Sequence, residues 1–181
     1  MNDQYQIKSQ DELCDHYEAP RQSSHSKVHH ELTEMMQRWL QKSPFFILSS
    51  CASDGIDCSP RGDEPGTAFQ IIDKKHLAIP DRRGNNRIDT LNNILIDPRV
   101  GLVFLMPGVY ETLRVKGEAS ITVNPELLQR FQLKGITPAT VMLVNIQSVY
   151  VQNARAIRAA ELWKPSDNAP ETIPSARDLS V

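Results

Sequence analysis

The sequence has few cysteines and no long apolar segment. Its three cysteines are an odd number without the paired spacing of a zinc site, so neither a disulfide framework nor a structural zinc is predicted. No stretch approaches the roughly 20 apolar residues that cross a bilayer, and the polar, acidic N-terminus does not resemble a secretory signal. These absences favour a reducing, cytoplasmic location with no membrane partner.

The sequence also lacks an excess of charge of either sign. It has 20 Lys and Arg against 22 Asp and Glu, a formal net charge of −2, whereas general nucleic-acid binders are strongly basic. Its 181 residues, 40% hydrophobic and 23% charged, are typical of one globular domain. Nucleic acid is therefore not an expected partner, and basic residues are informative only where they cluster.

Potential redox and metal side chains are sparse. Cys51 and Cys58 lie symmetrically about Asp54-Gly55, so a hairpin there would bring them face to face, and two free thiols are favoured over a bridge. Three histidines without a matching carboxylate pattern lie near one predicted helix start, and we interpret them as surface residues: His25, His29 and His30.

Hydrophobic periodicity predicts a few helices. Residues 26–43 carry an amphipathic helical stripe that ends before Pro44, formed by Val28, Leu32, Met35, Met36, Trp39 and Leu40. Further helices are predicted at 87–97, at 124–131 and at 153–163. The second of these begins with Asn124 as N-cap and Pro125 at the first helical position.

Strand signals cover most of the remaining chain. Hairpins are predicted at 45–60, 66–80 and 99–123, followed by a final strand at 139–152. Short connections favour antiparallel pairing, so the predicted fold is mainly β with short helices, a small closed or partly split barrel of about six strands. The predicted organisation is an N-terminal arm at 1–25, one domain at 26–163 and a C-terminal tail at 164–181.

One junction gathers positive charge. The stretch "AIPDRRGNNRIDTL", residues 78–91, places three arginines and two asparagines around Gly84, between a strand-like and a helix-like run. A helix N-terminus exposes backbone N–H groups that favour an anion, and arginines add donors suited to phosphate. The alternative is a solvated polar loop.

A second cluster, "CSPRGDEPG" at 58–66, places Ser59 and Arg61 near a strand end. Its alternative interpretation is a turn closed by an Arg61–Asp63 salt bridge.

A third cluster, "ETLRVKGEA" at 111–119, projects Thr112 and Arg114 from one face of a strand. Here the alternative is a surface pair between Glu111 and Arg114.

In their chain order, 58–66, then 78–91, then 111–119, the three blocks resemble the FMN-binding split-barrel proteins related to pyridoxamine 5′-phosphate oxidase. The similarity covers roughly residues 26–163, and the long block "LAIPDRRGNNRIDTLNNILIDPRVGLVFLMPG" is its most specific part. The resemblance implies a six-stranded antiparallel Greek-key split barrel. It also implies a homodimer with one FMN in each of two clefts at the subunit interface, where the partner chain supplies some contacts.

The resemblance also implies which residues bind FMN. The residues along the flavin and its phosphate would be Ser59, Pro60 and Arg61. The residues beside the flavin ring and the ribityl chain would be Ile79, Pro80 and Asp81. The phosphate-holding turn would be Asn85, Asn86 and Arg87, while Thr112 and Arg114 would lie near the ring. Arg82 and Arg83 are expected only to line the entrance.

Two departures limit the resemblance. The segment ending "WKPSDNAPETIPSARDLSV" lacks the Arg-x-His segment with which the pyridoxamine phosphate oxidases handle substrate, so that specific activity is not expected. Gln152 and Asn153 replace a His-Cys pair of the nearer relatives, so this position has no titrating group.

These observations predict an FMN-dependent oxidoreductase that exchanges two electrons with an unidentified small molecule. No residue stands out as an obligatory acid or base. Two alternatives remain open: a non-catalytic protein that binds flavin, haem or deazaflavin for sensing, storage or electron transfer, and a ligand-free barrel acting in an assembly.

Overall fold

The structure, a computed structural model, describes residues 5–19, 27–53, 55–64, 66–84, 86–153 and 155–164. Several predicted features lie outside the described residues: His25, the turn residue Asp54, the site residue Asn85 and residues 165–181 of the predicted tail.

Most of the described chain forms β-strands, and its helices are short. The strands are β1 (Phe45–Ala52), β2 (Gly55–Gly62), β3 (Gln70–Ile71), β4 (His76–Asp81), β5 (Arg99–Leu105), β6 (Glu111–Thr122) and β7 (Thr140–Asn153). The helices are α1 (Gln10–Cys14), α3 (Glu34–Leu40), α4 (Asp89–Ile96), α5 (Pro125–Arg130) and α6 (Arg155–Ala159). The fold is therefore mainly β with short helices, as the sequence predicts.

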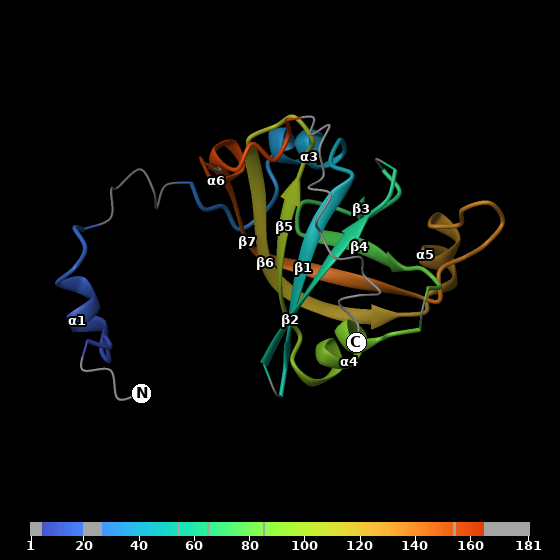
Figure 1. The fold of residues 1–181 in the computed structure, drawn as a ribbon. Helices are drawn as coiled ribbons and strands as arrows, with labels where there is room; N and C mark the ends of the chain where they lie inside the picture. The colour runs from blue at the N-terminus through green and yellow to red at the C-terminus, as the bar shows by residue number, and fades with distance from the viewer. Residues whose placement is uncertain are drawn as a thin grey trace, which may run out of the picture.

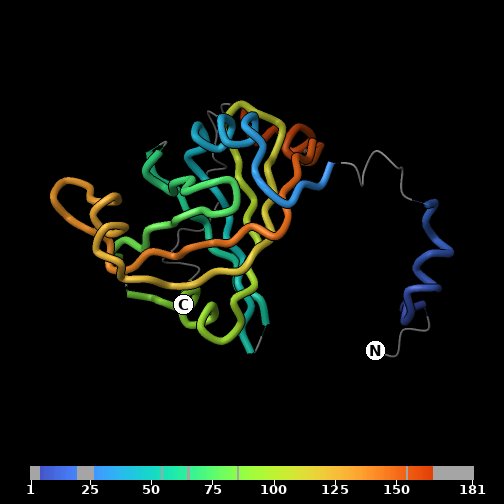
Figure 2. Tube along the Cα trace, turned by 180° about the vertical axis from the view of Figure 1, so that it is seen from behind, coloured from blue at the N-terminus to red at the C-terminus, as the bar shows by residue number. Residues whose placement is uncertain are grey.

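Within the described residues, seven strands form one antiparallel sheet in the order β2-β1-β5-β6-β7-β4-β3. Figures 1 and 2 show that this sheet is strongly curved. The sheet has seven strands and not the predicted six, because the short strand β3 is added at its edge. β3 has two residues and pairs only with Ala78 and Leu77 of β4. The two residues before β3, Ala68 and Phe69, are both buried in the core.

The main hydrophobic core of the described residues draws on β1, β4, β5, β6 and β7 together with α3 and α4. The rings of Phe46, Phe69 and Phe104 pack with centroids 4.9 to 5.8 Å apart, and burying each ring contributes roughly 2 kcal/mol. Met36 of α3 and Leu91 of α4 join this core, and Figure 1 shows the two helices at opposite ends of the sheet. The core thus holds α4, which carries much of the predicted site, against β1 and β6.

The β6–β7 pairing contains a β-bulge whose extra residue is Gln147 of β7, and Gly117 of β6 lies closest of the described glycines to a neighbouring backbone. The pairing of β6 with β7 shifts register between Lys116 and Gly117, and a Cβ on Gly117 would lie 2.2 Å from the carbonyl oxygen of Asn145. No side chain fits at that distance, so glycine is required for the two strands to approach here.

The predicted helix at 26–43 is wrong in its first half. Helix α3 begins after Thr33, whose hydroxyl accepts the N–H of Met36 at 3.2 Å. Before it, His29 is extended and exchanges two backbone hydrogen bonds with Val149, both at 2.8 Å. This pairing with β7 competes with the helix, and it leaves Val28 exposed.

The predicted hairpin at 45–60 is confirmed, but its register is not the predicted one. Ala52 pairs with Gly55, so Gly55 is already part of β2 and not of the predicted turn. The register therefore places Cys51 opposite Ile56 and Cys58 opposite Ser49. The two cysteines do not face each other, and all three cysteines are free thiols.

The remaining helix predictions are largely confirmed. The helix at 87–97 forms as α4, and in α5 the Asn124 side chain caps the N–H of Glu126 at 2.9 Å ahead of Pro125. The predicted helix at 153–163 forms only over α6.

The N-terminal segment is largely exposed. Helix α1 has no buried residue and lies away from the sheet in Figures 1 and 2. Among the described residues, no helix is both long and apolar enough to cross a membrane.

Candidate functional site

Arg61 joins three elements that are distant in the sequence. Its guanidinium donates to the hydroxyl of Ser59 on β2 at 3.3 Å, to the carboxylate of Asp81 at the end of β4 at 3.4 Å, and to the hydroxyl of Thr90 on α4 at 3.3 Å. The Arg61 side chain is 29% exposed and that of Asp81 19% exposed. We call these four residues the Arg61 junction. It brings the predicted motifs around 59–61 and 79–81 into contact with the helix that follows 85–87.

A second ion pair lies beside the junction. Arg82 donates to the carboxylate of Asp63 at 3.2 Å, to the carbonyl of Phe131 at 2.9 Å and to the carbonyl of Thr67 at 3.3 Å. The predicted alternative, an Arg61–Asp63 salt bridge, is therefore wrong, since Asp63 pairs with Arg82 and Arg61 with Asp81. Strand β2 is at one edge of the sheet order and β4 is next to the other edge, so these two pairs connect distant parts of the sheet.

The turn before α4 carries the remaining charges. Asn86 has a φ of 58°, a left-handed conformation that asparagine tolerates better than most residues. Arg87 donates to Asp89 at 2.5 Å, and this hydrogen bond raises the pKa of Arg87 above its ordinary value. Ile88, the N-cap of α4, offers no side-chain hydrogen bond, so the helix start lacks a side-chain cap.

Two clefts meet at Arg61. The α4–β2 cleft, about 430 Å³, is lined by Asp57, Cys58, Ser59, Pro60, Arg61, Arg87, Asp89 and Thr90. The arginine cleft, about 370 Å³, is lined by Arg61, Asp81, Arg82, Arg83, Gly84, Asn86, Arg87, Ile88, Leu91, Ala139 and Thr140. Two arginines face two aspartates in the first cleft, whereas four arginines face one aspartate in the second. The arginine cleft is therefore the more favourable place for an anion.

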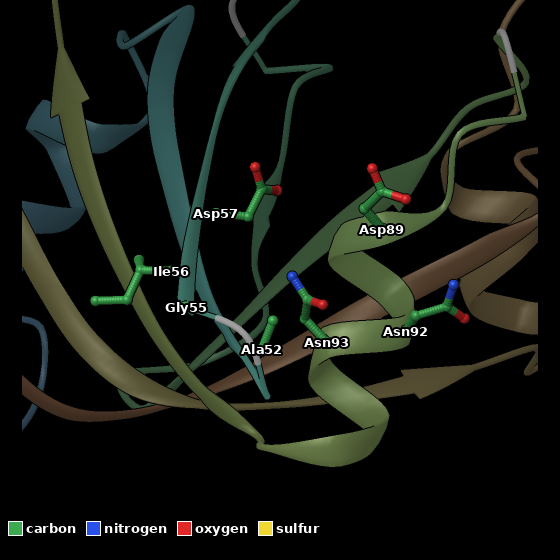
Figure 3. Close-up of a pocket in the computed structure, with 7 residues that line it drawn as sticks. All are labelled: Ala52, Gly55, Ile56, Asp57, Asp89, Asn92 and Asn93. Carbon is green, nitrogen blue, oxygen red and sulfur yellow. The ribbon is translucent and has the colours of Figure 1, made fainter.

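A further pocket continues the groove along α4 toward the β1–β2 hairpin. Figure 3 shows Asp57 on one side of this pocket and Asp89 and Asn93 of α4 on the other. The amide of Asn93 donates to the buried hydroxyl of Ser50 at 3.0 Å, which fixes α4 against β1. This acidic end of the groove does not favour a phosphate.

Ile79 and Pro80 lie behind the clefts. The side chain of Ile79 is 1% exposed and belongs to the hydrophobic core, and Pro80 is buried. Neither residue therefore lines the α4–β2 cleft or the arginine cleft within one chain. On β2, Ser59 and Arg61 share the half-buried face, while Pro60 between them is exposed.

Thr112 and Arg114 pair with the end of β7 that is far from Thr140. Arg114 is paired with Tyr150 of β7, ten residues from Thr140, which is roughly 33 Å along the strand. Its guanidinium donates to the side chain of Gln152 at 3.1 Å and lies 5.2 Å from the Tyr150 ring centroid. The alternative pair between Glu111 and Arg114 is wrong, since Gln152 is the partner. Thr112 is 5% exposed and donates to the carbonyl of Gln152 at 3.4 Å.

Sequence reasoning missed two threonines at the site. Thr90 binds Arg61 across 29 positions, and the Thr140 hydroxyl is buried in the wall of the arginine cleft without a hydrogen-bond partner among the described residues. Neither residue stands in a charged motif, so no local signal distinguished them from core threonines. The described residues contain no group of three or more potential metal ligands.

Comparison with known proteins agrees with this architecture. The family model described as pyridoxamine 5′-phosphate oxidase matches residues 32–153. No curated protein sequence matches the chain.

Solved structures share the fold at low identity. HupZ of group A Streptococcus is 15% identical, with a TM-score of 0.55 over 67% of this chain and 94% of that one. A candidate pyridoxamine 5′-phosphate oxidase of Lactobacillus delbrueckii is 23% identical, with a TM-score of 0.54 over 68% and 98%. General stress protein 26 of Bacillus anthracis is 16% identical, with a TM-score of 0.50 over 64% and 88%.

Proposed function

The chain belongs to the pyridoxamine 5′-phosphate oxidase family, and from this premise we propose that it is a homodimeric FMN-binding oxidoreductase. Its reaction would be a two-electron exchange with a small organic molecule. The fold we propose for the dimer subunit is a Greek-key split barrel. In its favour, the Arg61–Asp81 and Asp63–Arg82 pairs draw β2 toward β4 from opposite sides of the sheet order.

The observation that carries the proposal is the Arg61 junction. Three segments separated in sequence converge on one guanidinium at distances of 3.3 to 3.4 Å. A surface loop with solvated arginines would not need such a network, whereas a phosphate site requires a cation held in a fixed orientation. The residues present also fit a phosphate, since the arginine cleft has four arginines and a buried hydroxyl that lacks a partner.

When bound, FMN supplies the electron-transfer chemistry. Arg61 would bind the phosphate while Asp81 and Thr90 keep its guanidinium in place. Arg87 and the turn at Asn86 would add donors beside the start of α4. As the resemblance implies, the residues that line the nucleotide would be Ser59, Pro60, Ile79, Pro80, Asp81 and Asn85.

The placement of Thr112 and Arg114 supports the proposed dimer. Both lie at the end of β7 away from Thr140 and Asp81, and Arg114 is three strands from Pro60 across β5 and β1, so neither residue contacts its own Arg61 junction. A second copy would supply its Thr112 and Arg114 to the first copy's clefts. We expect Arg114 to lie near the flavin ring and to favour the anionic reduced form by its charge.

The test is the absorption spectrum of the purified protein. We expect a yellow protein that releases FMN at a ratio near one per chain, measured by fluorescence after heat denaturation, and a higher Tm with added FMN. A colourless protein whose Tm does not change with FMN would overturn the proposal.

A second measurement separates an enzyme from a binding protein. Anaerobic mixing of the FMN-loaded protein with NADH or NADPH should bleach the flavin absorbance on a timescale of seconds if these nucleotides are its reductants. Reduction only by dithionite would instead support the alternative role in flavin binding without turnover.

A further inference from the structure

Strand β2 contributes no residue to the hydrophobic core. None of its eight residues is buried, it lies at one edge of the sheet order, and β1 is its pairing partner among the described strands. The register of a strand is strongly specified where one of its faces is buried and weakly specified where neither is. The side chains that hold the present register are therefore polar. They are those of the Arg61 junction and, in the middle of the strand, the Ser49 hydroxyl and the Cys58 thiol, which hydrogen-bond at 3.1 Å.

Two thiols lie on one face of this hairpin, offset by two residues. Cys51 pairs with Ile56 and Cys58 with Ser49, so the two cysteines are diagonal neighbours. Diagonal neighbours have Cα atoms roughly 7–8 Å apart, whereas a disulfide spans roughly 4.4–6.8 Å. The observed register therefore keeps both thiols free, with Cys58 exposed and Cys51 half-buried.

A second register brings the two thiols together. A slide of β2 by two residues along β1 places Cys58 directly opposite Cys51, where the Cβ atoms of a pair lie roughly 4.5–5.5 Å apart. Because side chains alternate with a period of two, this slide keeps every β2 side chain on its present face. It also places Asp54-Gly55 at the centre of the connection, which is where the sequence alone predicts the turn.

We propose that Cys51 and Cys58 are an oxidation site, at which a hydroperoxide forms a disulfide that locks β2 in the shifted register. The exposed Cys58 thiol attacks one oxygen of hydrogen peroxide, the O–O bond breaks, and a sulfenic acid and one water form. The Cys51 thiol then attacks the sulfenic sulfur, the S–S bond forms, and the sulfenic hydroxyl leaves as a second water. Two thiols lose two electrons, and one peroxide is reduced to two waters.

The bridge would separate Arg61 from its partners. The slide moves Arg61 by two residues, roughly 7 Å, along β1. Asp81 and Thr90 stay in place, because β4 and α4 carry core residues that the slide does not touch. The hydrogen bonds of 3.3 to 3.4 Å that join Arg61 to them are therefore lost. A loss of FMN binding would follow if the proposed function holds, whereas the disulfide and the register change do not rest on it.

The experiment treats the reduced full-length Cys14→Ser protein with hydrogen peroxide, since Cys14 is also exposed and would otherwise compete. The intact mass should fall by about 2 Da, the two hydrogens of the thiols. Cleavage before Asp54 and Asp57 should then release two peptides joined by the bridge. Nuclear Overhauser contacts across the hairpin should change from Cys58 with Ser49 to Cys58 with Cys51. FMN affinity should fall about tenfold or more and return with dithiothreitol, which reduces the bridge.

Two variants in the same background serve as matched controls. Cys51→Ser removes one thiol, so peroxide should form no bridge and leave FMN affinity unchanged. Adding Ser49→Cys to Cys51→Ser places two thiols directly opposite each other in the present register. Its disulfide needs no slide, so FMN affinity should stay at the value of the reduced protein.

Absence of the Cys51–Cys58 bridge after peroxide would overturn the proposal, as would a bridge that leaves Cys58 in contact with Ser49 across the hairpin. A loss of FMN affinity in either oxidised control would assign the loss to something other than the register, and would also overturn it. If the reduced protein binds no FMN, the proposed function fails. The bridge and the changed hairpin contacts would then still support the oxidation site.

Discussion

The two ends of strand β7 are built differently, although both carry residues of the proposed site. At the Thr140 end, Arg61 is held by side chains from β2, β4 and α4, which meet only because the sheet curves. At the Gln152 end, Arg114 is held by Gln152 and Tyr150, which are its neighbours in the β6–β7 pairing. The first arrangement depends on tertiary structure, whereas the second depends on strand register alone. A change in sheet curvature should therefore disturb the first more than the second.

The largest effect is expected at the bulge between the two ends. Gly117→Ala would place a Cβ 2.2 Å from the Asn145 carbonyl oxygen, so the strands must separate, and we expect a loss of about 2 kcal/mol or more in the free energy of unfolding. Urea unfolding followed by tryptophan fluorescence measures this loss. In the control Gly101→Ala, the new Cβ has its nearest neighbour at 3.9 Å, and a change within about 0.5 kcal/mol is expected. Equal stability of the two variants would contradict the role of the bulge.

The second largest effect is expected at the Arg61 junction. Arg61→Ala removes the guanidinium that connects Ser59, Asp81 and Thr90, so FMN affinity should fall about 10- to 100-fold. Equilibrium titration with FMN measures the change. Arg99→Ala serves as control, because Arg99 is exposed and pairs with Asp97 two residues away. An FMN affinity in Arg61→Ala equal to that of the control would refute the phosphate role of Arg61.

A smaller effect is expected at the Gln152 end, where Arg114→Ala should weaken FMN binding several-fold and lower the flavin reduction potential.

Mixing Arg61→Ala with Arg114→Ala then tests whether two chains share each site. After subunit exchange, heterodimers would contain one intact site each, so about one quarter of all sites should regain wild-type affinity. No recovery after verified exchange would place both arginines in sites formed within one chain.

The smallest effect is expected for a pair that needs no tertiary structure. The side chain of Arg99 hydrogen-bonds to Asp97 and lowers the pKa of that carboxyl to about 2. The stabilisation from this ionised carboxylate is present above the ordinary pKa of 3.8 and is lost as the pH falls toward 2. The difference in unfolding free energy between the wild type and Asp97→Asn should therefore be constant at neutral pH and shrink between about pH 4 and pH 2. A difference that does not change over this window would contradict the lowered pKa.

The sequence predicts those structural features that depend on neighbouring residues better than those that depend on contacts between distant residues. The N-cap at Asn124 and the end of α4 before Pro98 depend on a few neighbouring residues, and both were predicted. The start of α3 was placed too early, at residue 26. The reason is that His29 pairs with Val149 of β7, more than a hundred residues later, and this pairing competes with the helix. Similarly, the sequence predicted that Cys51 and Cys58 face each other across the β1–β2 hairpin, but the observed register pairs them with other residues. The composition of the hairpin does not specify this register.

At the candidate site, the sequence by itself determined where the positive charge and the phosphate-like motifs lie. Those features are local: arginines, asparagines and a glycine next to the start of a helix. Only the tertiary structure decided which arginine meets which aspartate. Arg61 forms an ion pair with Asp81 and not with Asp63, which is nearer in the sequence. Asp63 pairs with Arg82, and Arg83 has no partner among the described residues. The physical reason is that these pairs form across a curved sheet, where strand order and curvature, and not distance in sequence, set which side chains are within hydrogen-bonding reach.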